Sequence, residues 1–139
     1  MLYTNYLCIL FHIIPHESLS MQLYWLTDNI GVSDQLYTKD ISELYQLGIK
    51  SIICNRPDFE SDYEQPTAES IKLASENLAI KFAFHPVKSN FQSKEDAAEM
   101  AKRLLELPKP LVAYCRSGGR STALIGLTQQ LNMIDLGDL

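Results

Sequence analysis

The feature that most constrains the fold of this chain is a short apolar run that leads directly into a glycine-containing loop. Residues 111–114 (Leu-Val-Ala-Tyr) predict a buried strand, and residues 115–120 read Cys-Arg-Ser-Gly-Gly-Arg. From Arg120 onward a helix is predicted, with apolar residues at helical spacing at Ala123, Leu124, Leu127 and Leu131. A strand, a tight loop and a helix in this order are typical of α/β folds, which bind ligands at the carboxyl edge of the sheet.

The rest of the chain repeats this alternation. Ser51–Cys54 and Ile80–Val87 predict strands, and Gln22–Leu26 with Val32–Ser33 predict a hairpin or two edge strands. Three further helices are predicted, with N-caps at Thr38, Thr67 and Ser93. Their expected inward-facing residues are Ile41, Leu44, Tyr45, Leu47, Ile71, Ala74, Leu78, Ala97, Met100, Ala101, Leu104 and Leu105. The pattern predicts an α/β domain with a largely parallel central sheet flanked by helices.

Composition and charge exclude several classes of partner. The 139 residues suit one domain, with 46% hydrophobic residues and a formal net charge of −5. No basic run is present, so neither nucleic acid nor an anionic membrane is expected as a partner. Three cysteines at unrelated spacings and three histidines without ligand spacing predict no disulfide framework, no metal site and no cofactor, and they suit a cytoplasmic protein.

The N-terminal segment differs from the body of the chain. We expect residues 1–20 to be a non-core extension and residues 21–139 to form the single domain. The apolar stretch Leu7–Ile14 is too short to cross a bilayer, and the first cationic residue is Lys39, which argues against a secretory signal. An uncleaved hydrophobic anchor is the alternative, although no stable membrane insertion is expected. The sequence does not specify an oligomeric state.

The loop at residues 115–120 carries the predicted chemistry. Gly118 and Gly119 allow backbone angles that other residues resist, so several backbone N–H groups can turn inward as an anion-binding nest. The N-terminus of the next helix adds its positive dipole end, and Arg120 adds a planar fork of donors. The predicted anion-binding residues are Arg116, Ser117, Gly118, Gly119 and Arg120.

The same field is expected to act on the Cys115 sulfur. Backbone donors and cations at a helix N-terminus lower the pKa of a thiol, so we predict that Cys115 is a thiolate and a nucleophile at neutral pH. Ser121 is placed to donate a hydrogen bond to that sulfur and to ease its departure as a leaving group. The simpler alternative is a buried structural cysteine before an ordinary glycine turn.

Four stretches of this sequence resemble a known family. They are residues 48–53 (Gly-Ile-Lys-Ser-Ile-Ile), 55–58 (Asn-Arg-Pro-Asp), 85–87 (His-Pro-Val) and 114–121 (Tyr-Cys-Arg-Ser-Gly-Gly-Arg-Ser). From about residue 35 to residue 130 the chain resembles the phosphatase-like domain of beta-lactamase-hydrolase-like proteins, which is related to protein tyrosine and dual-specificity phosphatases. The resemblance implies a protein-tyrosine-phosphatase-like fold, with Cys115 as nucleophile and Arg120 as anion clamp.

The loop departs from tyrosine phosphatases in two ways. Those enzymes have five residues between the cysteine and the arginine, whereas four separate Cys115 from Arg120, and they have histidine where this chain has Tyr114. The four-residue interval also resembles rhodanese-type sulfurtransferases. A shorter loop makes a smaller cradle, which fits a persulfide or thiosulfate sulfur better than a phosphoryl group in transfer.

A general acid is the second difficulty for phosphoester cleavage, because protonation of the leaving oxygen contributes about 10²–10⁴ in rate. Dual-specificity phosphatases supply an aspartate where this chain has residues 88–90 (Lys-Ser-Asn). Asp58 and Glu60 are the available substitutes, and we take Asp58 as the candidate acid, with a role in stabilising its turn as the alternative. Sulfur transfer needs no such acid.

Two more residues have open roles. Cys54 is a small core residue or forms a protective disulfide with Cys115. Arg56 points into the anion site or pairs with Asp58.

Three functions remain open at this point. The first is a cysteine-dependent phosphatase that forms a thiophosphate on Cys115, and the second is a sulfurtransferase that carries a persulfide there. The third is a non-catalytic anion-binding or redox-sensing domain. In each case the expected partner is a small oxyanion, a phosphorylated substrate or a sulfur donor.

Overall fold

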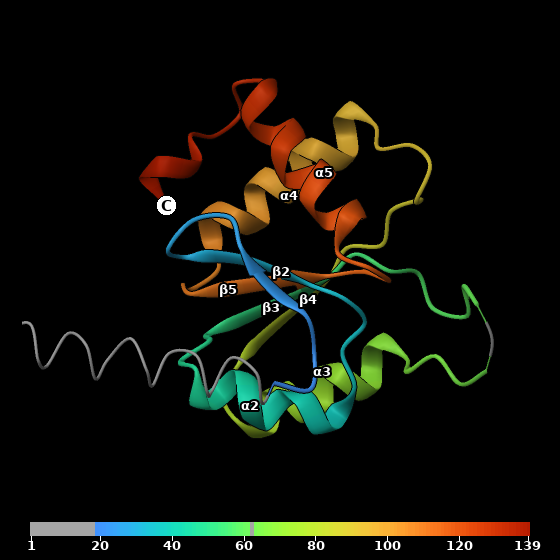
Figure 1. The fold of residues 1–139 in the computed structure, drawn as a ribbon. Coiled ribbons are helices and arrows are strands. Elements are labelled where there is room, and N and C mark those ends of the chain that lie inside the picture. Colours follow the sequence, from blue (N-terminus) through green and yellow to red (C-terminus); the bar gives the residue numbers. More distant parts are fainter. Residues whose placement is uncertain (1–18, 62) are drawn as a thin grey trace, which may run out of the picture.

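The fold is built on one five-stranded sheet, seen in a computed structural model that describes residues 19–61 and 63–139 (Figure 1). The strand order is β1-β2-β5-β3-β4, in which β1 pairs antiparallel with β2 and all other pairs are parallel. The strands are β1 (Leu23–Trp25), β2 (Ile30–Ser33), β3 (Ser51–Cys54), β4 (Lys81–Phe84) and β5 (Leu111–Tyr114). The predicted α/β class with a mostly parallel sheet is therefore confirmed.

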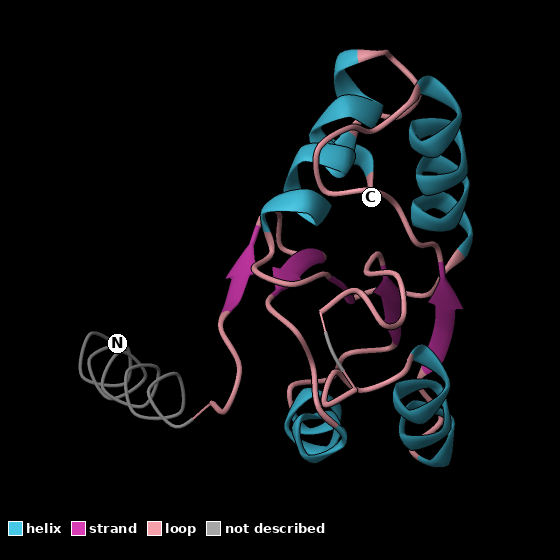
Figure 2. Ribbon diagram, turned by 90° about the vertical axis from the view of Figure 1, so that its right-hand side faces the viewer, coloured by secondary structure: helices cyan, strands magenta, loops and turns pink. Residues whose placement is uncertain are grey.

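Helices cover both faces of the sheet (Figures 1 and 2). On one face lie α4 (Lys94–Glu106) and α5 (Gly119–Gln130), and on the other lie α2 (Ile41–Gln46) and α3 (Ala68–Asn77). Two short 3-10 helices, η1 (Thr38–Asp40) and η2 (Leu136–Asp138), complete the described elements. The apolar core accordingly forms two clusters, one on each side of the sheet.

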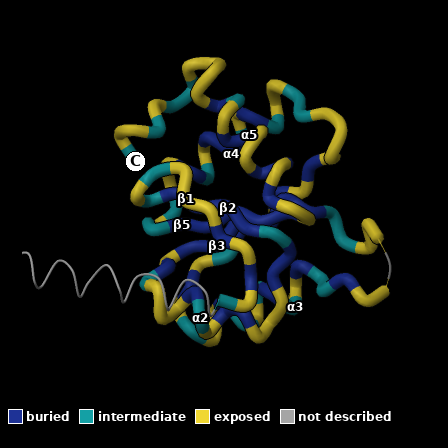
Figure 3. The backbone as a smooth tube through the Cα atoms, in the orientation of Figure 1, coloured by how far each residue is buried: buried dark blue, intermediate teal, exposed yellow. Residues whose placement is uncertain are grey.

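The three inner strands are buried along their whole length, as Figure 3 shows for β2, β3 and β5. Parallel strands covered by helices on both faces have no solvent side, so their sequences do not alternate between apolar and polar residues, and even Ser33 and Ser51 are buried. The edge strand β4 has exposed and buried residues along it. The centre of this sheet is β5, which delivers Cys115 to the carboxyl edge.

Two predicted helix caps are confirmed and one is wrong. Thr67 accepts a hydrogen bond from the Ser70 amide at the start of α3, and Ser93 forms a capping box with Asp96 at the start of α4. Thr38 instead begins η1, and α2 starts only after Asp40. The Asp40 carboxylate is fully buried and accepts from the Tyr37 amide at 2.8 Å, which fixes this tighter turn in front of the helix.

Several residues expected to face inward are exposed. Each helix packs on the sheet with one side only, so the buried stripe is narrower than the sequence pattern predicts. Leu105 is 58% exposed and Tyr45 is 54% exposed, although their neighbours Leu104 and Leu44 are fully buried. The other exposed residues of this kind are Leu47, Ala123 and Leu131, and β4 ends at Phe84 rather than at Val87.

The predicted N-terminal extension lies almost wholly outside the described residues, including the apolar stretch 7–14. At its end, Leu19 packs against the core cluster that also contains Met21. Ser20 donates its hydroxyl to the carboxylates of Asp40 and Glu43. Contact with the domain therefore starts at least two residues before Met21. Across residues 19–61 and 63–139, every helix is too short or too polar to traverse a bilayer.

Candidate active site

Cys115 lies in a polar cavity of about 330 Å³ at the carboxyl edge of the sheet. The loop between β5 and α5 forms one side of the cavity, and the loop after β3 forms another. Its lining residues are Glu60, Ser61, Ser89, Cys115, Arg116, Ser117 and Arg120. The structure thus brings Cys115, Arg116, Ser117 and Arg120 together as the sequence predicts.

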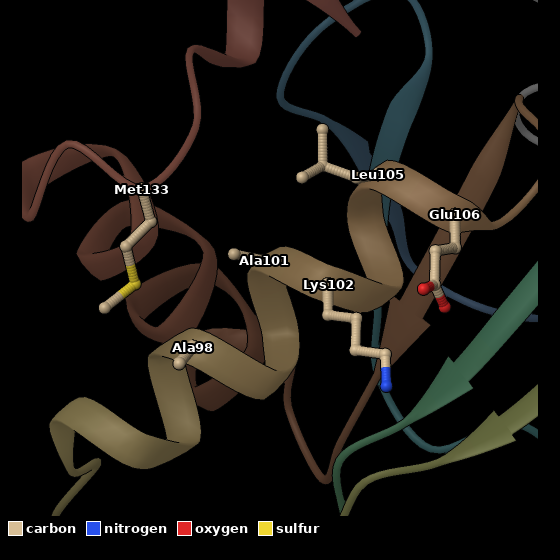
Figure 4. Close-up of a pocket in the computed structure, with 6 residues that line it drawn as sticks. All are labelled: Ala98, Ala101, Lys102, Leu105, Glu106 and Met133. Carbon is tan, nitrogen blue, oxygen red and sulfur yellow. The ribbon is translucent and has the colours of Figure 1, made fainter.

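A different hollow on the outer side of α4 has no such chemistry (Figure 4). It has a volume of about 440 Å³ and an apolar surface. It is lined by Ala98, Ala101, Lys102, Leu105, Glu106 and Met133. None of these six residues is a nucleophile or belongs to the anion-binding loop. Of these two cavities, the one at Cys115 is therefore the candidate active site.

The backbone of the loop curls around the sulfur. Gly118 has φ of 99°, in the left-handed region where a side chain is strained, and its N–H donates to the Cys115 sulfur at 3.1 Å. The carbonyl of Arg116 points away and accepts from the Gln35 amide at 3.1 Å. Gly119 is the first residue of α5 and does not need a positive φ, so only Gly118 is required by the turn.

Hydrogen bonds lower the pKa of the Cys115 thiol. Burial of the sulfur acts in the opposite direction and is the largest single influence. The backbone amides of Ser121, Gly118 and Arg120, together with the Ser121 hydroxyl, more than offset it, so that the pKa lies below that of an ordinary cysteine. Cys115 is only 1% exposed, and a reagent would reach its sulfur from the cavity that it lines.

Ser121 lies beneath the sulfur and is fully buried. Its hydroxyl donates to Oδ1 of Asn55 at 2.9 Å, a contact between residues 66 positions apart in the chain. Asn55 is itself fully buried at the end of β3. The sequence analysis included Asn55 in the stretch 55–58 that resembles the family, but assigned it no role in the site.

The Arg120 guanidinium is fixed from two sides. It forms two contacts with Glu60, from Nη1 to Oε2 at 3.0 Å and from Nη2 to Oε1 at 3.0 Å. Nη1 also donates to the Val87 carbonyl at 3.1 Å. Nε is buried and is without a partner in the described part of the chain.

Glu60 joins two arginines. Besides Arg120, it accepts from Nε of Arg56 at 2.9 Å, while the other Arg56 nitrogens donate to Gln35 at 2.8 Å and to Ser61 at 2.6 Å. Burial raises the pKa of the Glu60 carboxyl. The hydrogen bonds and charges of the two guanidinium groups lower it by more than burial raises it, so the net pKa lies below its usual value and the carboxyl stays ionised. Neither open role for Arg56 is confirmed, because its carboxylate partner is Glu60 rather than Asp58, and Arg56 is not among the residues that line the cavity of Cys115.

The structure does not bring Asp58 to the cavity. Its Oδ1 accepts from the Ala68 amide at 2.7 Å and caps the first turn of α3. Asp58 instead lines a separate hollow with Ala68, Phe82 and Phe84. The interpretation of Asp58 as an acid is therefore replaced by the alternative, a structural residue of its loop, and Glu60 is the carboxylate that reaches the site.

Cys54 is a core residue. It is 2% exposed, packs in the cluster on the α2 and α3 side of the sheet, and donates its thiol to the Arg56 carbonyl at 3.3 Å. Burial raises the pKa of this thiol to about 11. The structure describes both Cys54 and Cys115 as free thiols.

The fold and the family match define a class of protein, a phosphatase-like domain with a protein-tyrosine-phosphatase-like fold. Residues 22–132 match the phosphatase-like domain of beta-lactamase-hydrolase-like proteins, and the chain belongs to that family. A curated beta-lactamase-hydrolase-like protein of Agrobacterium fabrum is 27% identical over 112 residues. The match covers 81% of this chain but only 26% of that relative, so the chain spans about a quarter of its length.

Solved structures show the same fold. A candidate phosphatase of Neisseria meningitidis is 32% identical, with a TM-score of 0.73 over 83% of this chain and 81% of that one. A second candidate phosphatase, from Shewanella putrefaciens, is 18% identical, with a TM-score of 0.70 over 89% of this chain and 81% of that one. The catalytic core of the PP-IP phosphatase of S. cerevisiae is 20% identical, with a TM-score of 0.62 over 83% and 68%. The last two likenesses show the fold alone.

Proposed function

We propose that this domain is a cysteine-dependent phosphatase that cleaves a phosphate monoester through a thiophosphate on Cys115. The observation that carries the proposal is the position of the sulfur. It lies at 3.1 Å from an inward-pointing loop amide, and Arg120 stands in the wall of the same polar cavity. Membership of the phosphatase-like family supports the same reaction class.

The reaction has two steps in this site. The Cys115 thiolate attacks phosphorus, the S–P bond forms and the ester P–O bond breaks, and the leaving oxygen takes the electron pair. Loop amides and the Arg120 guanidinium stabilise the charge on the equatorial oxygens. Water then attacks phosphorus, loses a proton to solvent, and releases inorganic phosphate while the sulfur returns to the thiolate.

The described lining residues include no carboxyl group that is available to protonate a leaving group, and this affects which leaving groups are favoured. Glu60 is the only carboxylate that lines the cavity in that part of the chain, and its two arginine partners keep it ionised. A leaving oxygen that needs no proton is therefore favoured, as in an aryl phosphate monoester. Alkyl phosphates are expected to be poor substrates.

The leaving group has space beside the cavity. A neighbouring polar cavity of about 480 Å³ shares Ser61 and Arg116 with the first, and Tyr37 stands at its rim with 47% exposure. An aryl or other planar leaving group would stack on this ring while Arg116 contacts its polar substituents. The domain therefore suits substrates larger than a bare oxyanion.

Sulfur transfer is the second candidate, and a specific observation favours it. The loop has four residues between Cys115 and Arg120, and the described site lacks an uncommitted acid. In this reaction the thiolate attacks the sulfane sulfur of thiosulfate, an S–S bond forms, and sulfite leaves with its electron pair. Cyanide or a thiolate then removes the sulfur from the persulfide, without any proton transfer to a leaving oxygen.

Parallel assays distinguish the candidates. Purified protein is given p-nitrophenyl phosphate in one arm and thiosulfate with cyanide in the other, beside Cys115→Ser and Arg120→Ala. Phosphate release that both variants lose, by about 10²-fold or more, supports the phosphatase. Thiocyanate formation with a persulfide on Cys115 and no phosphate release would replace it with the sulfurtransferase. Turnover in neither arm would leave an anion-binding or redox-sensing domain.

A further inference from the structure

Arg56 lies behind the cavity of Cys115 and is fixed through all three nitrogens of its guanidinium group. Nε donates to Oε1 of Glu60 at 2.9 Å, Nη1 donates to Gln35 at 2.8 Å, and Nη2 donates to the Ser61 hydroxyl at 2.6 Å. The Arg56 side chain is only 6% exposed. It lines the neighbouring polar cavity and not the cavity of Cys115. A buried cation therefore lies next to the candidate anion site without lining it.

The Glu60 carboxylate stands between this cation and Arg120. Its Oε1 accepts from Nε of Arg56 and from Nη2 of Arg120, and its Oε2 contacts Nη1 of Arg120 at 3.0 Å. The Glu60 side chain is the most exposed of the three, at 26%. The charges of both guanidinium groups lower the pKa of the Glu60 carboxyl, so both act on the same ionised group.

This carboxylate is an anion inside the site that is expected to bind one. Glu60 lines the same cavity as Arg120 and Cys115, and it takes donors from both terminal nitrogens of Arg120. Paired with Arg120 alone, it would cancel the positive charge of the guanidinium and compete with an incoming oxyanion for its donors. With Arg56 as a second partner, the group of three side chains keeps one net positive charge.

We propose that Arg56 is a positioning residue that holds the Glu60 carboxylate back from the anion site, so that Arg120 stays available to the oxyanion of a substrate. Arg56 lies outside the cavity of Cys115 and acts on the site through Glu60. The inference rests on the proposed function only in taking that cavity as an oxyanion site, so it holds for a phosphate ester or for thiosulfate.

Protection of Cys115 by inorganic phosphate tests this without turnover. The rate of alkylation by iodoacetamide is measured against phosphate concentration at neutral pH and constant ionic strength, which gives the dissociation constant of phosphate. The proteins compared are the full chain, Arg56→Gln, Arg56→Lys, Glu60→Gln and the double variant Arg56→Gln with Glu60→Gln.

The expected loss depends on the charge at both positions. Arg56→Gln should weaken phosphate binding by about fivefold to tenfold, because the carboxylate then turns to Arg120 alone. Arg56→Lys keeps a cation beside Glu60 without the planar fork, so its loss should be limited to about twofold to threefold. In the Glu60→Gln background, Arg56→Gln should change the dissociation constant by less than about twofold, since no carboxylate remains to be held back.

Arg103 offers a matched control on α4. Its Nε contacts Glu99 at 2.7 Å, and the two residues have the same four-residue spacing as Arg56 and Glu60. Arg103→Gln removes the same charge from an exposed pair and should leave phosphate binding within about 1.5-fold of wild type. A loss equal to that of Arg56→Gln would show that only the net charge of the chain matters and would overturn the proposal.

A merely structural role for Arg56 gives a different pattern. A loop loosened by loss of the bonds to Gln35 and Ser61 would bind phosphate poorly with or without the Glu60 charge. The proposal is therefore overturned if the loss from Arg56→Gln persists in the Glu60→Gln background. It is equally overturned if Arg56→Gln binds phosphate as wild type does, or if Arg56→Lys binds no better than Arg56→Gln.

Thermal unfolding is measured in parallel, because Arg56 is buried and has three partners. If Arg56→Gln does not fold, Arg56→Lys takes its place in both backgrounds, and its smaller loss should again disappear with Glu60→Gln. A wild-type protein that phosphate does not protect would overturn the inference whatever its turnover. Normal protection and the expected pattern of losses, without turnover of any phosphate ester, would overturn the phosphatase assignment alone.

Discussion

The ends of β3 and β5 place two cysteines close together in the sheet and give them opposite chemistry. Cys54 is the last residue of β3 and pairs in register with Tyr114, the last residue of β5, so Cys115 is the first residue after the neighbouring strand. Successive side chains point to opposite faces, and that single step takes one sulfur into the core and the other into a cavity.

The donors around each sulfur explain the difference. The Cys54 thiol donates to a carbonyl, and burial raises its pKa to about 11. The Cys115 sulfur is also buried, but it accepts from the Gly118 amide at 3.1 Å, and the hydrogen-bond donors of the loop lower its pKa. Both thiols are almost inaccessible to solvent, so reactivity here depends on which hydrogen-bond groups the backbone presents.

The largest expected effect comes from substituting each of the two cysteines in turn. Cys115→Ser should lower turnover of the true substrate by at least about 10³-fold, because a serine hydroxyl is not ionised in this loop. Cys54→Ala should stay within about threefold of wild type, as it removes only a buried sulfur and costs about 1 kcal/mol of stability. Rates and unfolding midpoints for both proteins test the contrast, and equal losses of activity would break it.

Alkylation of the native protein gives the next effect. At neutral pH, Cys115 should react at least about 10²-fold faster than Cys54, because only Cys115 combines a lowered pKa with a lining position in a cavity. Mass spectrometry of the modified peptides measures the ratio. In concentrated urea the two rates should converge, and a ratio that survived unfolding would show that the fold is not its cause.

Two adjacent glycines sharpen the comparison from the side of the backbone. Gly118→Ala forces a side chain into φ of 99° and should cost about 1–2 kcal/mol, with slower alkylation of Cys115 as its amide moves away. Gly119→Ala lies in the first turn of α5 with an ordinary φ and should change stability by less than about 0.5 kcal/mol. Denaturant unfolding of both variants, with equal m-values, measures the difference.

The smallest expected effect is the pH dependence contributed by Glu60. Because its folded pKa is depressed, it stabilises the fold above the unfolded carboxyl pKa of about 4.3, and this contribution is lost as pH falls through the folded value. Glu60→Gln should therefore lower the unfolding temperature at pH 7 and differ less from wild type below about pH 4. A constant difference across that range would show that the carboxylate charge is not involved.

Local patterns were sufficient to predict the reactive loop. The strand at residues 111–114, the glycine turn and the helix after it are contiguous, so the position of Cys115 follows from the sequence order alone. The caps at Thr67 and Ser93 are equally local.

Contacts between distant residues could not be predicted in this way. The Arg120 partner is Glu60 rather than Asp58, and only the path of the loop after β3 decides between two carboxylates that are two residues apart. Likewise, the bond between Ser121 and Asn55 exists because β3 and β5 are neighbours in the sheet, which no spacing along the chain reveals. Similarly, Leu105 is exposed because α4 packs on the sheet with one side only, and the sequence pattern does not show how wide that side is.

The charged side chains that line the cavity of Cys115 have a kinetic consequence. Arg116 and Arg120 line the cavity together with Glu60 and the ionised Cys115 sulfur, so the lining is formally neutral, whereas the whole chain carries a net charge of −5. An incoming anion is therefore repelled by the net charge until it lies within about a Debye length, about 10 Å at 0.1 M salt, and is then bound by the guanidinium and amide donors of the cavity. Added salt should therefore screen the long-range repulsion first. As salt is added from a low ionic strength, the rate of substrate capture should rise, and at high ionic strength it should fall again.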